Sequence, residues 1–219
     1  KSTILAAYLK PFREGKREKA LPAAKLLMGS IVSNGATHLL TGENQTALTQ
    51  GYYSDYTKFS DFEAEAIRRY YDYMIRYENL FFDPELQDVT MTHTGWDNYE
   101  YQCTSHKVSS YGEAGKIWMI LREKDYRKCI YLLNLCGQSE DYWNEGKEEP
   151  NIQKDIKFTV QVDTPVEKIC FSTPDGENMD AIELSFTERT TKTGKFIDFT
   201  VPSLNYWTTI WIDTRKETI

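Results

Sequence analysis

The stretch ATHLLTGEN, residues 36–44, decides how the first part of this chain is interpreted. Ala36 to Leu40 form a short run of apolar and β-branched side chains, which is typical of a buried strand. The run passes directly into a turn that presents the carboxylate of Glu43 and the amide of Asn44. Such a turn serves solubility if it is a surface loop, or chemistry if it carries polar side chains from a strand into a pocket.

The segments around this stretch predict a parallel α/β arrangement for residues 1–85. Residues 3–9 (TILAAYL) are a short apolar run that ends before a proline, and proline cannot donate to a strand ladder. Residues 18–32 space their apolar side chains by three and four, as a helix does. A second strand follows at 36–40, and residues 61–82 have the strongest helical pattern in the chain. The order strand, helix, strand, helix is the rhythm of parallel α/β folds.

The connection between the second strand and the second helix has two notable features. Residues 41–58 are expected to form a long loop, which contains Tyr52, Tyr53 and Tyr56. Ser60 precedes the helix and has a glutamate three residues later, which predicts a capping box.

The rhythm changes near residue 86, where we place a domain boundary. Several segments after it alternate apolar and polar residues, and the spacers between them are rich in turn residues. Regular short strands of this kind predict an antiparallel β-sandwich over residues 86–219. The predicted strands are 116–122, 128–135, 156–162, 167–171, 181–187, 196–201 and 207–212.

Composition excludes several classes of protein. The 219 residues carry a net charge of -7, and an acidic chain repels the phosphate backbone, so we expect no nucleic-acid partner. No apolar run approaches the length of a membrane helix, and we expect no signal peptide within these residues. The chain begins with Lys1 and not with methionine, so we expect it to derive from a longer protein. The four cysteines fit no zinc or redox spacing and are expected to be free, and no metal or cofactor motif occurs.

Two blocks of sequence resemble a known family. NGATHLLTGENQTALTQGYYSDYTKFS (34–60), followed by YYDYMIRYENLFF (70–82), resembles the end of the catalytic barrel in glycoside hydrolase family 66, which contains dextranases and cycloisomaltooligosaccharide glucanotransferases. KIWMILREKDYRKCIYLLNL (116–135) and FTVPSLNYWTTIWI (199–212) are similar to the β-sandwich domain that follows this barrel.

The resemblance implies that residues 1–85 are the last two units of a (β/α)₈ barrel. The carboxyl ends of the strands line the active site of such a barrel. Tyr8, Lys10, Glu43 and Asn44 follow the two strands and are therefore expected to bind substrate. The implied partners are an α-glucan polysaccharide or oligosaccharide and the upstream barrel residues of the parent chain. Tyr52, Tyr53 and Tyr56 could stack on sugar rings or pin their loop to the barrel.

The family's chemistry implies that this chain alone lacks the catalytic residues. Retaining glycosidases use two carboxyl groups about 5–5.5 Å apart, and the resemblance implies that both lie on earlier barrel strands. We therefore assign no catalytic residue here, and we expect Glu43 to accept hydrogen bonds from sugar hydroxyls or to hold its own loop. The parent protein would be a bacterial enzyme acting on α-1,6-glucan outside the cell or at its surface, by hydrolysis or by cyclising transfer.

Other interpretations remain open at this point. The chain could be a non-catalytic carbohydrate-binding or scaffolding module that exposes Trp96, Trp143 or Trp207, although Trp207 lies so close to Trp211 that at most one face of that strand is exposed. A protein-interaction domain based on the tyrosine-rich loop is a third possibility. Two βα units cannot close a barrel, so residues 1–85 must pack on the sandwich or on another copy if the chain folds alone.

Overall fold

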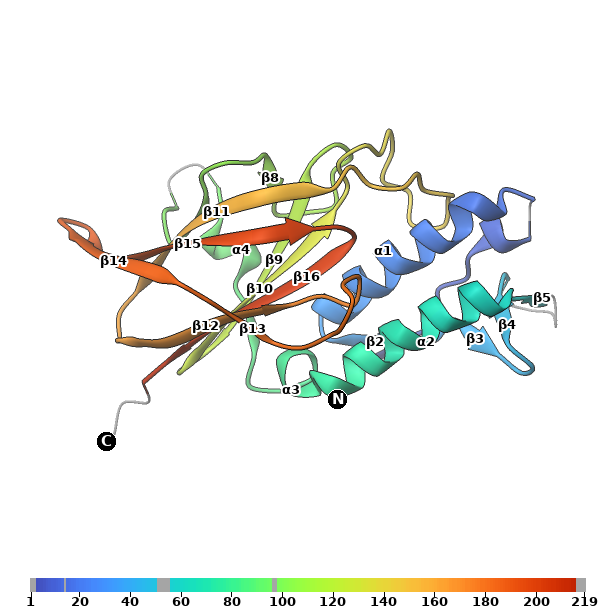
Figure 1. Ribbon diagram of the computed structural model, residues 1–219, viewed down its shortest axis with the longest axis horizontal. Helices are drawn as coiled ribbons and strands as arrows, with labels where there is room; N and C mark the ends of the chain where they lie inside the picture. The colour runs from blue at the N-terminus through green and yellow to red at the C-terminus, as the bar shows by residue number, and fades with distance from the viewer. Residues whose placement is uncertain (1–2, 14, 51–55, 96–97, 216–219) are drawn as a thin grey trace.

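The computed structural model describes residues 3–13, 15–50, 56–95 and 98–215 (Figure 1). Strands dominate, and the helices α1 (Ala20–Ser33) and α2 (Asp61–Arg76) lie together at one end of the molecule. The predicted order of the first part is confirmed, because β1 (Thr3–Leu5) precedes α1, and β2 (Ala36–His38) follows it and pairs with β1 in parallel. Both strands are shorter than the sequence suggests.

The segment predicted as a loop contains a small antiparallel sheet instead. Its strands are β3 (Thr41–Gly42), β4 (Thr46–Leu48) and β5 (Tyr56–Lys58). Asn44 and Gln45 make the turn between β3 and β4 with φ angles of 55° and 56°. This left-handed conformation is unusual for glutamine, so the residue types at this turn did not indicate a hairpin.

Helix α2 begins as predicted and ends early. Ser60 Oγ accepts a hydrogen bond from the Glu63 amide at 3.3 Å, and the Glu63 carboxylate accepts one from the Ser60 amide at 2.7 Å, so the capping box is confirmed. The predicted helix breaks at Tyr77, where φ is -115°, and a short helix α3 (Glu78–Phe81) follows. The Tyr77 hydroxyl donates to the Met179 carbonyl at 2.6 Å and its ring packs on Trp211, so tertiary contacts override the helical pattern.

The remainder of the chain forms two antiparallel sheets packed face to face, which we call the two-sheet body. This body also contains the four-residue helix α4 (Thr90–His93). Two short 3₁₀ turns, η1 (Lys10–Phe12) and η2 (Arg17–Lys19), lie in the α/β part. The larger sheet has the order β13-β12-β16-β10-β9-β6, with β8 added parallel to β9, and the smaller sheet has the order β14-β15-β11-β7. The strands are β6 (Gln87–Asp88), β7 (Tyr101–Cys103), β8 (Val108–Ser109), β9 (Ile117–Lys124), β10 (Arg127–Asn134), β11 (Gln153–Val162), β12 (Val166–Ser172), β13 (Ile182–Leu184), β14 (Phe186–Thr191), β15 (Gly194–Leu204) and β16 (Trp207–Thr214).

Alternating apolar and polar residues along a strand determine which side chains are buried between the two sheets. Phe158, Val160 and Val162 of β11 are buried there, as their spacing predicts. The same expectation is wrong for Ile182, which is half exposed because the chain leaves one sheet between β13 and β14 and joins the other.

The central strands of the larger sheet are buried on both faces. In β10, Ile130 and Leu132 face the smaller sheet, whereas Tyr131 and Leu133 belong to a second core on the opposite face. All eight residues of β16 are buried for the same reason. A strand between two apolar layers shows no alternation in its sequence.

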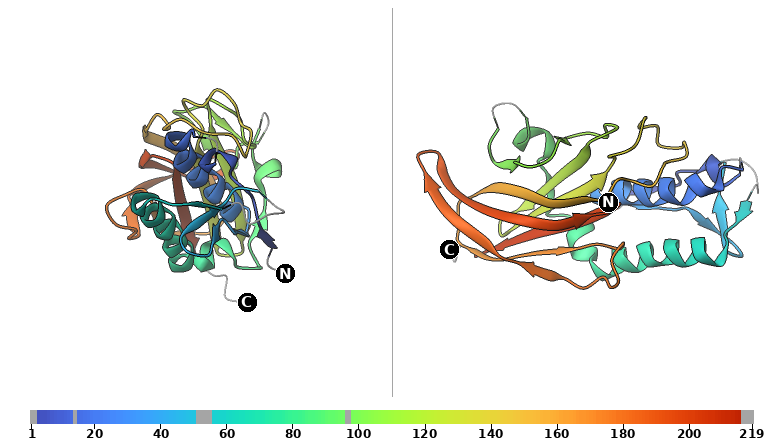
Figure 2. Two further views of the ribbon diagram at one scale, coloured as in Figure 1. Left: turned by 90° about the vertical axis from the view of Figure 1, so that its right-hand side faces the viewer. Right: turned by 45° about the horizontal axis from the view of Figure 1, so that its top comes forward.

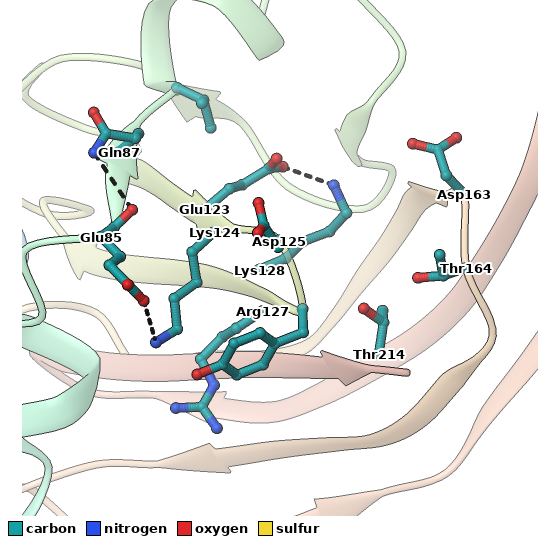
Figure 3. Close-up of a pocket in the computed structure, with 12 residues that line it drawn as sticks. Glu85, Gln87, Glu123, Lys124, Asp125, Arg127, Lys128, Asp163, Thr164 and Thr214 are labelled. Carbon is teal, nitrogen blue, oxygen red and sulfur yellow. Dashed lines mark hydrogen bonds and ion pairs between the residues drawn. The ribbon is translucent and has the colours of Figure 1, made fainter. Parts of the chain in front are cut away.

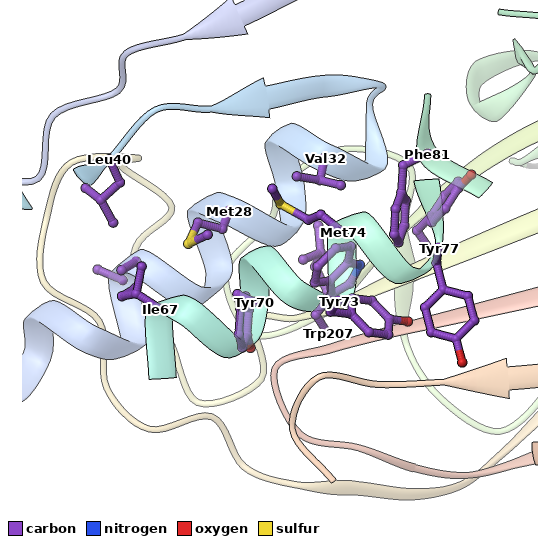
Figure 4. Packing of buried hydrophobic residues seen from close by; sticks show 14 of the residues in the cluster. Met28, Val32, Leu40, Ile67, Tyr70, Tyr73, Met74, Tyr77, Phe81 and Trp207 are labelled. Atoms are coloured by element: carbon purple, nitrogen blue, oxygen red, sulfur yellow. The ribbon is translucent and has the colours of Figure 1, made fainter. Parts of the chain in front are cut away.

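The second core lies between this outer sheet face and the helices (Figure 4). Trp207 is fully buried at its centre, with ring centroids 5.0 Å from Tyr73, 5.2 Å from Phe81 and 6.0 Å from Tyr70. The order of layers is therefore helices, larger sheet, smaller sheet. Figure 2 shows the two long helices side by side at one end of the strands. Residues 1–85 therefore pack on the two-sheet body. This is one of the two possibilities considered above, the other being packing on a second copy of the chain.

A buried carboxylate, that of Asp175, lies between the helices and the larger sheet. Asp175 accepts hydrogen bonds from the Tyr70 hydroxyl at 2.7 Å and from the amides of Tyr206 and Trp207, both at 3.1 Å. The ammonium of Lys25 on α1 lies 3.7 Å from the carboxylate. Asp175 therefore links both long helices to the loop that leads into β16.

Gly29 allows α1 to approach the sheet closely. A Cβ at this position would lie 2.7 Å from Leu133 Cδ2 and 3.0 Å from the Trp207 ring. We expect Gly29→Ala to lower the free energy of unfolding by about 1–2 kcal/mol, because the overpacking outweighs the ~1 kcal/mol gain in helix propensity. Urea denaturation measures the change. Gly112→Ala is the control, because its Cβ would meet the Trp118 ring at an ordinary 3.5 Å; stabilisation by Gly29→Ala would contradict the close approach.

Candidate functional site

The carboxyl ends of β1 and β2 form a small rim. The Leu9 amide donates to the Leu48 carbonyl at 3.1 Å, and the Leu48 amide donates to the Leu40 carbonyl at 2.8 Å. Strand β4 therefore bridges the segments that follow the two parallel strands. Beside it, the Tyr71 hydroxyl donates to the His38 carbonyl at 2.8 Å and accepts from the Leu40 amide at 3.2 Å, which holds α2 against β2.

Glu43 and Asn44 lie at the tip of the hairpin between β3 and β4. Both are exposed, and the Glu43 carbonyl accepts a hydrogen bond from Thr46 Oγ1 at 2.5 Å. The groove beside the hairpin has a volume of about 640 Å³ and is lined by Thr41, Gly42 and Gln45 together with residues of α2, and Glu43 and Asn44 are not among its lining residues. The two side chains are therefore exposed at the tip of the hairpin and do not line this groove.

Tyr8 and Lys10 occupy the other side of the rim. Tyr8 is half-buried between β1 and η1. The ammonium of Lys10 pairs with the carboxylate of Glu145, which comes from the connection between β10 and β11. Sequence reasoning did not anticipate this partner, because Glu145 lies in a segment that has the composition of a solvated acidic loop. The two-sheet body therefore contributes a carboxylate to the rim.

His38 has a structural position. Its ring is fully buried, and Nε2 lies 2.9 Å from the Ala7 carbonyl of the neighbouring chain segment. Nδ1 has no hydrogen-bond partner within the described part of the chain. Burial lowers the pKa of His38 below its ordinary value, against a smaller opposing effect of the Ala7 carbonyl, so the ring is neutral at pH 7 and ties the two strand segments together.

The aromatic residues proposed for sugar contact fall into three groups. Tyr52, Tyr53 and Trp96 lie outside the described residues, as does the side chain of Tyr56. Trp207 is completely buried, so the expectation that its ring is open to a ligand is wrong. The side chain of Trp143 is 52% exposed and remains available.

A second concavity of about 660 Å³ lies at the far end of the two-sheet body, around the turn between β9 and β10 (Figure 3). Its charged side chains largely neutralise one another. Lys128 pairs with Glu123 at 2.8 Å, Lys124 pairs with Glu85 at 3.6 Å and also with Asp83, and Arg127 pairs with Asp213 at 2.6 Å. We assign no ligand to this concavity.

The structure gives no indication of a metal centre or a membrane span in the residues it describes. Those residues contain no group of three or more His, Cys, Asp or Glu side chains arranged to hold a metal ion. Among the described helices, none combines the length and apolar character that a membrane crossing requires. The four cysteines are free thiols, as expected, and Cys129 and Cys170 are buried.

The fold and the rim together define a class of protein: parallel βα units with polar side chains after the strands, joined to antiparallel sheets. Comparison with known proteins narrows this class, because the sequence model of Glycosyl hydrolase family 66 matches residues 1–211. The chain belongs to this family.

Individual relatives agree with the family assignment. The chain is 28% identical over 193 residues to a cycloisomaltooligosaccharide glucanotransferase of Niallia circulans, and 26% identical over 191 residues to a second such protein of that organism. These matches cover 87% and 86% of the chain but 19% of each relative. The crystal structure of a Paenibacillus sp. cycloisomaltooligosaccharide glucanotransferase complexed with cycloisomaltoheptaose has the same fold over 86% of this chain and 27% of that protein, with a TM-score of 0.76 and 23% identity.

Proposed function

We propose that this chain is the C-terminal part of a retaining glycoside hydrolase that acts on α-1,6-glucan. In this proposal residues 1–85 are the last two units of a (β/α)₈ catalytic barrel, and residues 86–219 are the β-sandwich domain that follows it. Membership of glycoside hydrolase family 66 supports the enzymatic parentage, and the names of the glucanotransferase relatives support an isomaltooligosaccharide-type glucan as substrate.

One structural observation carries the barrel proposal. Strand β1 has β2 as its one neighbouring strand among the described residues, and α1 packs against β2. All three residues of β1 are exposed, including Ile4 at 67% and Leu5 at 42%, so the described part of the chain covers neither face of this strand. Parallel strands are normally paired at their edges and covered on both faces, and the other units of a barrel would supply these neighbours.

The proposed substrate contacts come from the rim. Tyr8 and Lys10 follow β1, while Glu43 and Asn44 follow β2, and active sites of (β/α)₈ barrels lie at this end of the strands. The exposed carboxylate of Glu43 and amide of Asn44 are suited to accept and donate hydrogen bonds to sugar hydroxyls. The nucleophile and the acid/base, which a retaining mechanism requires, are proposed to lie on barrel strands outside this chain.

The location of the enzyme follows from its substrate. Dextran is a polymer too large to enter a cell, so we place the enzyme of which this chain is part outside a bacterial cell or at its surface. The net charge of -7 agrees with a neutral sugar partner and not with a polyanion.

Substitution of Glu43 in the enzyme that contains this chain tests the proposal. We expect Glu43→Gln to lower kcat/KM on dextran by about 10–100-fold, because a hydrogen bond to a charged acceptor contributes roughly 1.5–3 kcal/mol. Reducing ends measure hydrolysis, and mass spectrometry detects cyclic products. Glu78→Gln is the control, because Glu78 is exposed on α3, away from the rim.

Two results would contradict the proposal. Equal activity of the Glu43 and Glu78 variants would remove Glu43 from the substrate site. Failure of the unsubstituted enzyme to produce linear or cyclic products from dextran would overturn the enzymatic proposal, and retention of uncut dextran would then favour the non-catalytic carbohydrate-binding module.

A further inference from the structure

A loop of the two-sheet body reaches the rim of the parallel strand pair. This rim loop, residues 136–149, belongs to the connection between β10 and β11 and lies against the start of α1 (Figure 1). The Lys147 amide donates to the Lys19 carbonyl at 3.0 Å, and a Cβ on Gly146 would lie only 2.8 Å from Lys19 Cβ. Helix α1 starts on the side where β1 ends, so the rim loop lies on the ligand-binding side that barrel geometry defines.

The rim loop is built around a buried lysine. The side chain of Lys147 is 6% exposed, and its ammonium donates to Glu140 at 2.5 Å and to the Tyr142 carbonyl at 2.6 Å. The Tyr142 amide donates to the other oxygen of Glu140 at 2.6 Å. Gln138 joins the two ends of the loop through two hydrogen bonds with the backbone of Glu148, of 2.7 and 3.0 Å. These bonds fix the backbone of the loop before any ligand arrives.

Two aromatic side chains project from this fixed backbone. Tyr142 is 67% exposed and Trp143 is 52% exposed. Trp143 lies against α1, where it lines a small cavity with Leu26 and Leu27. Tyr142 faces the rim and lines a pocket of about 350 Å³ together with Pro11, Lys16, Lys19, Glu140, Glu145 and Gly146. A large ring that is carried by a fixed backbone and is open to solvent is suited to bind a ligand.

The charges of this pocket favour a neutral, hydroxyl-rich ligand. Two lysines and two glutamates line it, so no single sign of charge dominates. Ammonium groups donate to hydroxyl oxygens and carboxylates accept from hydroxyl protons. The tyrosine ring offers an apolar face for the apolar side of a pyranose ring.

We propose that the rim-loop pocket is an accessory glucan subsite, in which Tyr142 stacks on a glucose unit outside the catalytic centre. Glu140, Lys16 and Lys19 bind the hydroxyl groups of that unit. The pocket lies next to Lys10, which the ion pair with Glu145 connects to the rim loop. The identity of the ligand as an α-1,6-glucan rests on the proposed function, whereas the binding position rests on the geometry of the loop.

Binding of isomaltopentaose to the full 219-residue chain tests this subsite. We expect saturation-transfer NMR with millimolar sugar to detect binding, and we expect Tyr142→Ala to weaken it about tenfold. Tyr142→Phe keeps the ring and should bind nearly as the unsubstituted chain does. Tyr99→Ala is the matched control, because Tyr99 is also an exposed tyrosine but contacts Phe196 of β15. Circular dichroism verifies that each variant is folded.

Each outcome has a defined meaning. No binding by the unsubstituted chain, or equal binding by the Tyr142→Ala and Tyr99→Ala variants, overturns the subsite. Neither result affects the proposed function, which the cleavage of dextran by the complete enzyme tests separately. Equal binding of maltopentaose would retain the subsite for glucans and remove its specificity for α-1,6 linkages.

Discussion

Replacement of Trp207 by alanine is expected to lower the free energy of unfolding by about 3–5 kcal/mol, as large-to-small changes at buried aromatic residues do. The indole is fully buried and contacts the rings of Tyr70, Tyr73 and Phe81, so its removal leaves a cavity between the helices and the larger sheet. Urea denaturation measures the loss. Hydrogen exchange of α1 and α2 amides should also accelerate, because the helices lose their main contact with β16.

Trp207→Phe separates packing from polarity at the same position. The indole Nε1 is buried and has no hydrogen-bond partner among the described residues. Phenylalanine removes this unsatisfied group and keeps most of the ring contacts, so its cost should be well below that of alanine. A loss below about 1 kcal/mol for Trp207→Ala would show that the helices do not depend on this core.

Local sequence patterns were sufficient for much of the fold. The capping box at Ser60 and Glu63 and the alternation in β11 depend on residues that are close along the chain, and both appear as predicted. The hairpin at Asn44 and Gln45 was missed, because glutamine rarely adopts a positive φ. All of β16 is buried because helices from the N-terminal part of the chain cover its outer face. Residues close to β16 in sequence give no indication of this cover.

The candidate site was predictable only where it follows strand ends. Glu43 and Asn44 could be proposed as rim residues because a turn directly follows an apolar strand. The approach of the rim loop was not predictable, since Lys10 and Glu145 are separated by 135 positions. The sequence contained one indication of this loop's role. Tyr142 and Trp143 are large aromatic residues in a segment that is otherwise charged and expected to be exposed, and exposed aromatic side chains are unfavourable unless they have a binding role.

Asp175→Ala is the second change with a large expected effect. It leaves the Tyr70 hydroxyl and the amides of Tyr206 and Trp207 without their acceptor, and Lys25 without its counter-ion. Loss of one partner from a buried charged network costs about 3–5 kcal/mol, and we expect a loss of unfolding free energy in this range. Asp175→Asn keeps an acceptor oxygen for the two amides and should cost clearly less.

The pH dependence of the asparagine variant provides a separate test. Burial raises the pKa of the Asp175 carboxyl above its ordinary value, and Lys25 and the hydrogen-bond donors offset only part of this effect. Between the unfolded pKa, about 3.9, and the raised folded pKa, the folded state binds more protons than the unfolded state. The contribution of Asp175 to stability is therefore fully present below pH 3.9 and decreases as the pH rises through the folded pKa. The unfolding free energy of the wild type minus that of Asp175→Asn should fall across this window in urea titrations, and a rise would mean that Lys25 and the donors outweigh burial.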